Sequence, residues 1–151
     1  MISEADWVEA VLTARSNLDK LTRLHEFVCG FCAEHGLAED LAEDCSLALE
    51  EVFGNVVRYG YRDSAEHQIL VRMAMEDGSV VLTIEDDGIA FNPLEVPPPD
   101  FELPIENRPV GGLGMHLVRS LMETLEYARE DGRNLLTMRK PVLQGNSPDV
   151  L

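Results

Sequence analysis

Residues 51–61 read Glu-Val-Phe-Gly-Asn-Val-Val-Arg-Tyr-Gly-Tyr and end a longer run with helical spacing of apolar residues. Because an α-helix turns by about 100° per residue, Glu51, Asn55 and Arg58 stack along one border of the apolar face. Glu50 points elsewhere, so only Glu51 can share a ligand with Asn55. Polar residues at the border of an amphipathic helix are also common without any function. The pattern therefore indicates either a site on a helix edge or an ordinary solvated border.

The bulk composition fits a globular protein with an excess of negative charge. The chain has 151 residues, 45% of them hydrophobic, which is enough for one domain with a core. Lys and Arg total 12 against 28 Asp and Glu, for a net charge of -16. This charge argues against direct nucleic-acid binding and suits a basic protein partner. A bound nucleotide would need a metal ion, helix N-termini or a few arginines near its phosphates.

Neither a targeting segment nor a disulfide framework is expected. The N-terminal residues lack the basic and apolar regions of a signal peptide, and no apolar run is long enough to cross a membrane. We therefore expect a cytoplasmic protein. Cys29 and Cys32 form a C-x-x-C motif with His25 one turn earlier, which fits either a metal or redox site or half-buried core cysteines. The mid-helix position favours core cysteines.

The periodicity predicts an α+β fold. A strand is expected over residues 6–14, a helix over 17–35 and a second helix over 39–59. Alternating apolar residues around Asp77-Gly78 and around Asp131-Gly132 predict two hairpins. The apolar face of the second helix is expected to contain Leu41, Cys45, Ala48, Leu49, Val52, Phe53, Val56 and Tyr59. This order predicts a two-layer sandwich in which helices cover one face of a mostly antiparallel mixed sheet.

A proline-rich segment separates the two hairpins. Repeated prolines over residues 92–109 predict a long loop without regular structure, and loops of this length are uncommon unless functional. A further helix is expected from residue 111 to about residue 122. We expect a single domain over residues 1–141 and a flexible tail over residues 142–151.

One strand of the first hairpin ends at two acidic residues and a glycine. The sequence Leu-Thr-Ile-Glu-Asp-Asp-Gly covers residues 82–88, and strand alternation places Asp86 on the buried face. An ionised carboxylate only accepts hydrogen bonds, which fits the exocyclic amine of adenine and disfavours the carbonyl of guanine. Gly88 allows a ligand ring to approach the backbone. The alternative is an Asp-Gly turn at a strand end.

Two glycines open the helix after the proline-rich segment. Gly112 and Gly114 leave backbone N–H groups and the positive end of the helix dipole available to phosphate. A flexible lid hinge is the alternative interpretation. The missing third glycine and the upstream prolines argue against a Rossmann dinucleotide site. His116, in the same helix, is expected to be a lid or surface residue.

Together, these three segments resemble the N box and the two glycine boxes of the GHKL ATPase superfamily, whose members share the Bergerat ATP-binding fold. The sequence is most similar to the anti-sigma factor serine kinases of sporulation and stress response. The shared motifs are Glu-x-x-x-Asn at residues 51–55, Asp-Asp-Gly-Ile-Ala-Phe-Asn-Pro at residues 86–93 and Gly-Gly-Leu-Gly-Met at residues 111–115. The resemblance covers about residues 6–140.

The resemblance assigns a role to each motif. It implies that Asn55 coordinates a Mg²⁺ ion bridging the phosphates of ATP and that Asp86 holds adenine. Gly88 would line the base pocket, and Gly112 and Gly114 would hold phosphate at the lid end.

The remaining residues of the helix acquire roles in the same way. Glu51 would be the general base, because a serine hydroxyl attacking the γ-phosphoryl group needs a carboxylate beside the metal. Arg58 would contact phosphate, and Tyr59 the face of the nucleotide. Two positions depart from the family pattern: Tyr59 stands where histidine is common, and Ala90 replaces a second glycine.

The implied function is an ATP- and Mg²⁺-dependent serine-protein kinase that also sequesters a sigma factor. Its substrate would be a serine on a STAS-type anti-anti-sigma protein, in a partner-switching mechanism, and family members commonly form homodimers. The alternative is a nucleotide-binding regulatory module without phosphotransfer. A sensor histidine kinase is disfavoured because no His-bearing dimerisation hairpin precedes the first motif, and gyrase-like or mismatch-repair ATPases need a transducer domain.

Overall fold

The computed structural model describes residues 7–13, 18–63, 65–97, 100–104, 106 and 112–142. The elements, in chain order, are β1 (Trp7–Thr13), α1 (Leu18–Glu34), α2 (Glu39–Tyr59), β2 (Gln68–Glu76), β3 (Ser79–Asp86), the 3₁₀ turn η2 (Pro93–Glu95), α3 (Gly112–Leu121), β4 (Thr124–Glu130) and β5 (Arg133–Pro141).

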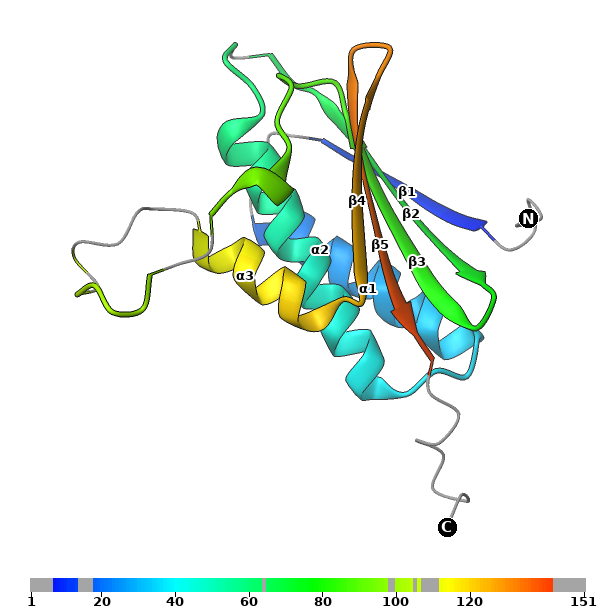
Figure 1. The fold of residues 1–151 in the computed structure, drawn as a ribbon. Helices are drawn as coiled ribbons and strands as arrows, with labels where there is room; N and C mark the ends of the chain where they lie inside the picture. The colour runs from blue at the N-terminus through cyan, green and yellow to red at the C-terminus, as the bar shows by residue number, and fades with distance from the viewer. Residues whose placement is uncertain are drawn as a thin grey trace.

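The five strands form one open sheet in the order β1-β2-β3-β5-β4. Every pairing among these strands is antiparallel. The three helices lie together on one face of this sheet (Figure 1). The predicted α+β sandwich is therefore confirmed, and the described part of the sheet contains no parallel pair.

Both predicted hairpins are present, and their turns explain the choice of residues. The φ angles are 49° at Asp77 and 78° at Gly78, and 51° at Asp131 and 75° at Gly132. Two successive residues with positive φ are typical of the type I′ turn, whose twist matches that of the flanking strands. Asp and Gly are among the residues that most readily adopt this conformation.

The core lies between the helices and the inner face of the sheet. Leu49 and Phe53 of α2 are fully buried, and they pack with Leu82 and Ile84 of β3. Most of the predicted apolar face of α2 is confirmed, but Tyr59 is 43% exposed. Its ring lies beside the Arg58 guanidinium in the last turn of the helix, where the periodic pattern continues but the core does not.

The start of the proline-rich segment is more ordered than the sequence predicts. Pro93 opens the η2 turn, where its missing N–H costs no hydrogen bond, and the Asn92 side chain accepts a hydrogen bond from the backbone N–H of Leu94. Arg119 of α3 donates to the carbonyl oxygen of Leu94. These contacts tie the start of the segment to α3. Residues 98–99, 105 and 107–109 of the segment, and the predicted tail from residue 143, lie outside the described residues.

The cysteines behave as core residues. Burial raises the pKa of Cys32 to about 11 and that of Cys45 to about 12, so both remain thiols at neutral pH. Within the described residues, no group of three or more His, Cys, Asp or Glu side chains is placed to hold a metal ion. The helices that the structure describes include none with the length and apolarity to span a membrane.

Candidate active site

A pocket opens where α2, α3 and the inner face of the sheet meet. Its lining is mostly apolar, with Asn55, Asp86 and Asn134 as buried polar residues. The full lining is Val52, Asn55, Val56, Gly60, Ile84, Asp86, Phe91, Pro93, Met115, Tyr127, Asn134 and Leu136. An apolar pocket with a few convergent polar groups is typical of small-molecule sites. The fold thus brings together Asn55 and Asp86, which the sequence analysis selected from separate motifs.

The carboxylate of Asp86 has one occupied and one available oxygen. The residue is only 4% exposed, as strand alternation predicted. Its Oδ1 accepts hydrogen bonds from the Gly88 N–H at 2.8 Å and from Asn134 Nδ2 at 3.0 Å. None of the described residues donates to Oδ2. An available carboxylate oxygen in an apolar pocket fits a ligand donor such as an exocyclic amine.

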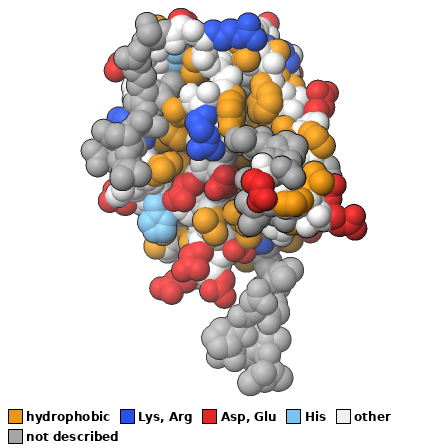
Figure 2. Space-filling model, turned by 90° about the vertical axis from the view of Figure 1, so that its left-hand side faces the viewer, with side chains coloured by type: hydrophobic (Ala, Val, Ile, Leu, Met, Phe, Trp, Pro, Cys, Tyr) orange, Lys and Arg blue, Asp and Glu red, His pale blue; other side chains and the backbone are white. Residues whose placement is uncertain are grey.

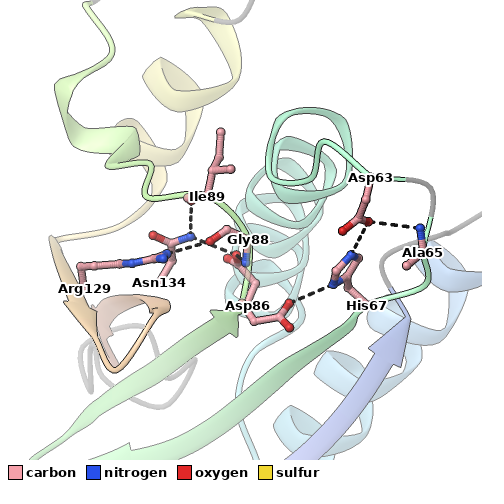
Figure 3. Close-up of polar contacts among 9 residues, drawn as sticks. Asp63, Ala65, His67, Asp86, Gly88, Ile89, Arg129 and Asn134 are labelled. Carbon is pink, nitrogen blue, oxygen red and sulfur yellow. Dashed lines mark hydrogen bonds and ion pairs between the residues drawn. The ribbon is translucent and has the colours of Figure 1, made fainter.

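Asn134 holds Asp86 in place and was missed by the sequence analysis. It lies on β5 directly opposite Asp86 on β3. Its amide nitrogen also donates to the carbonyl oxygen of Ile89 at 2.8 Å (Figure 3). Its Oδ1 accepts from the Phe91 N–H at 3.2 Å and from the hydroxyl of Tyr127. The sequence could have indicated that Asn134 is buried, because strand alternation places it on the same face of β5 as Leu136.

Gly88 is required by packing of the backbone. A Cβ atom at this position would lie 2.4 Å from the carbonyl oxygen of Gly60 and 2.9 Å from Asp86 Oδ1. The neighbouring Ile89 N–H donates to the same Gly60 oxygen at 2.8 Å, and Arg129 donates to the Gly88 carbonyl oxygen at 2.8 Å. The turn after β3 is thus pressed against the end of α2. Gly88 is outside the lining of the main pocket, so its expected contact with a base stays a prediction.

Replacing Gly88 with alanine is expected to destabilise the protein by about 1–3 kcal/mol, because the new methyl group overlaps a backbone oxygen that cannot rotate away. Urea unfolding measures the change. The matched control is Gly30→Ala in α1, where a Cβ meets nothing within 4 Å and alanine should stabilise the helix by about 0.5–1 kcal/mol. A Gly88→Ala variant as stable as the wild type would contradict the packing explanation.

Asn55 sits at the edge of the pocket beside two polar neighbours on α2. It is 7% exposed, and its Oδ1 accepts a hydrogen bond from Arg58 Nη2 at 3.2 Å. Arg58 also lies 5.8 Å from the centre of the Tyr59 ring. Neither Arg58 nor Tyr59 lines the pocket. Their predicted contacts with a ligand therefore stay predictions, whereas Asn55 lines the pocket and its amide oxygen has a second lone pair.

Glu51 meets the start of α3. A Cβ atom on Gly114 would lie 2.5 Å from Glu51 Oε2, so the glycine is what allows this carboxylate to lie against the first turn of α3. Gly112 is the first residue of α3, while Gly111 lies outside the described residues. Glu51 is also one helical turn from Asn55. A carboxylate, an amide oxygen and a helix N-terminus therefore converge at one end of the site.

This arrangement fits a nucleotide bound with a divalent cation. The apolar pocket and the available oxygen of Asp86 suit a base with an exocyclic amine, and the N-terminus of α3 suits phosphate. The amide oxygen of Asn55 is a ligand that Mg²⁺ accepts, and the ion would offset the negative charge of the phosphates and of Glu51. The fold and the pocket together match the Bergerat-type arrangement that the sequence resemblance implies.

The chain belongs to the histidine kinase-like ATPase domain family, whose model matches residues 14–140. The serine-protein kinase RsbW of Bacillus mycoides (strain KBAB4) is 25% identical over 140 residues, which cover 90% of this chain and 86% of the relative. The RsbW of Bacillus cereus (strain AH820) is 26% identical over the same shares. The resemblance to GHKL ATPases is thus confirmed.

A solved structure shares the fold. The crystal structure of the RsbU and RsbW domains of Rv1364c from Mycobacterium tuberculosis matches with a TM-score of 0.64 and 17% identity. The match covers 90% of this chain and 32% of that longer chain. At this identity the comparison concerns the fold, and it confirms the predicted architecture.

Proposed function

We propose that the chain is an ATP-dependent serine-protein kinase that phosphorylates a STAS-type anti-anti-sigma protein and also binds a sigma factor. The observation that carries the proposal is the position of Glu51, whose carboxylate lies against Gly114 at the start of α3 and one turn from Asn55. Phosphorylation of a hydroxyl needs a base beside the phosphate end of ATP. The names of the RsbW relatives support the same reaction and substrate residue.

The roles of the residues follow from their positions. Asp86 would accept a hydrogen bond from the adenine amine, and the first turn of α3 would bind phosphate oxygens through its N–H groups. Asn55 would hold Mg²⁺, which neutralises phosphate charge when bound. Glu51 would accept the proton of the serine hydroxyl while the serine oxygen bonds to the γ-phosphorus. The bond from that phosphorus to the β,γ-bridging oxygen breaks, and ADP leaves.

The charge of the protein supports a basic partner. On the face that carries α3, clusters of acidic side chains lie below a smaller group of basic ones (Figure 2). With a net charge of -16, the protein is complementary to the basic, DNA-reading surfaces of a sigma factor. The charge sets the kind of surface that can dock and does not select one sigma factor.

A second candidate is a regulatory ATP-binding module without phosphotransfer. The observation in its favour is the hydrogen bond from Arg58 to Asn55 Oδ1, which occupies one lone pair of the proposed metal ligand. The other lone pair remains for a cation. The kinase is the better-supported function because a protein without phosphotransfer would have no use for the carboxylate of Glu51 against Gly114.

Incubation with γ-labelled ATP, Mg²⁺ and candidate STAS proteins separates the two functions. The kinase predicts label on a serine of one partner and no label when that serine is replaced by alanine. Nucleotide binding without transfer to any candidate would favour the module.

A further inference from the structure

A histidine outside the pocket lies between two carboxylates. His67 Nε2 is 2.7 Å from Asp63 Oδ1, and His67 Nδ1 is 3.2 Å from Asp87 Oδ1. Its ring stacks on Tyr61 with centroids 3.9 Å apart and an interplanar angle of 9°. The side chain is 17% exposed. Figure 3 shows this cluster beside the turn formed by residues 86–89, which we name the base-binding turn.

The two contacts require a doubly protonated ring. An ionised carboxylate only accepts hydrogen bonds, so both ring nitrogens of His67 must donate. A neutral imidazole carries one N–H and would lose one of the two bonds. The hydrogen bond to Asp63 is the largest cause that raises the pKa of His67 above its usual value; partial burial opposes it, and Asp87 adds to it. Among the residues that the structure describes, the titratable groups facing the ring are Asp63 and Tyr61 after α2, and Asp87 after β3.

His67 completes the support of the base-binding turn. Asn134 and Arg129 hold the turn from the side of β4 and β5 through the carbonyl oxygens of Ile89 and Gly88. On the other side, the chain after α2 holds it through the Gly60 oxygen and through His67 on Asp87. Asp87 lies between Asp86 and Gly88, so its side chain is an anchor for the residue proposed to bind adenine.

We propose that His67, as an imidazolium, is a positioning residue for ATP binding, and that it makes the affinity depend on pH. The proposal rests on the proposed ATP site. Because the pKa of His67 is raised in the folded protein, His67 makes both hydrogen bonds, to Asp63 and to Asp87, at low pH. One of these two hydrogen bonds is lost as the pH rises through that pKa. The loss should weaken ATP binding by up to about fivefold, the size expected of an exposed ion pair.

Titration calorimetry with Mg²⁺ and ATP from about pH 6 to about pH 9 tests this proposal on the whole chain. The measured quantity is the ratio of the affinities of variant and wild type at each pH, in which the titration of ATP itself cancels. His67→Gln should bind several-fold more weakly at low pH and approach the wild type at high pH. His67→Arg, which stays charged, should keep its affinity at high pH. His35→Gln, just past the end of α1, is the control, and its ratio should stay near one.

A His67→Gln ratio that does not change with pH would overturn the role of His67 while leaving the ATP site intact. Wild-type protein that binds no ATP at any pH would overturn the proposed function and this inference with it. A purely structural role would lower the stability of His67→Gln without producing a pH-dependent ratio of affinities.

Discussion

Replacing Glu51 with glutamine is expected to slow phosphotransfer by about 10²- to 10⁴-fold, the usual contribution of a positioned general base. Glutamine has nearly the same shape, so it fits against Gly114, but it cannot accept the proton of the serine hydroxyl. ATP affinity should change little, because Glu51 lies outside the lining of the base pocket. Single-turnover transfer of labelled phosphate to the partner measures the rate.

The adjacent glutamate provides the control for this variant. Glu50 points away from Glu51, and its Oε1 accepts a hydrogen bond from Ser46 at 3.4 Å. Glu50→Gln removes the same charge from the same helix turn and should transfer phosphate at the wild-type rate. If Glu51→Gln retained full transfer, Glu51 would not be the base.

Replacing Asp86 with asparagine is expected to weaken ATP binding by about 10- to 150-fold, the range for losing a hydrogen bond to a charged group. Asparagine has one acceptor oxygen. If that oxygen keeps its bonds to Gly88 and Asn134, an amide N–H₂ replaces Oδ2 and points a donor at the adenine amine. Calorimetry with Mg²⁺ and ATP measures the affinity.

A charge-matched control lies on the same strand. Glu85 is one residue earlier, so its side chain points to the opposite face of the sheet, where it pairs with Arg133 at 3.1 Å. Glu85→Gln should bind ATP like the wild type. Wild-type affinity in Asp86→Asn would show that this carboxylate does not hold the base.

Local patterns predicted the fold and the positions of the main site residues. The 3.6-residue period of α2 placed Glu51 and Asn55 on one border, and strand alternation buried Asp86. The same patterns failed where tertiary packing decides. Tyr59 continues the apolar period of α2 but is exposed in the last turn, because a period does not show where the core ends.

Contacts between distant segments were beyond the reach of the sequence. Asn134 meets Asp86 only because β5 inserts between β3 and β4, and the strand order is not readable from alternation. Gly88 is a glycine because the end of α2 presses on it, a contact that depends on how helix and sheet pack. His67 meets Asp87 for a different reason, because both lie just beyond the paired ends of β2 and β3, where Leu70 lies opposite Glu85.

The central claim is that Asp86, Asn55 and the start of α3 form a single site for ATP and Mg²⁺. A crystal structure of the protein with Mg²⁺ and a non-hydrolysable ATP analogue tests it most directly. We expect the adenine amine on Asp86, the metal ion on the amide oxygen of Asn55, and phosphate at the first turn of α3 beside Glu51. A nucleotide bound elsewhere, or one that lies in the pocket without contacting Asp86 and Asn55, would contradict the account.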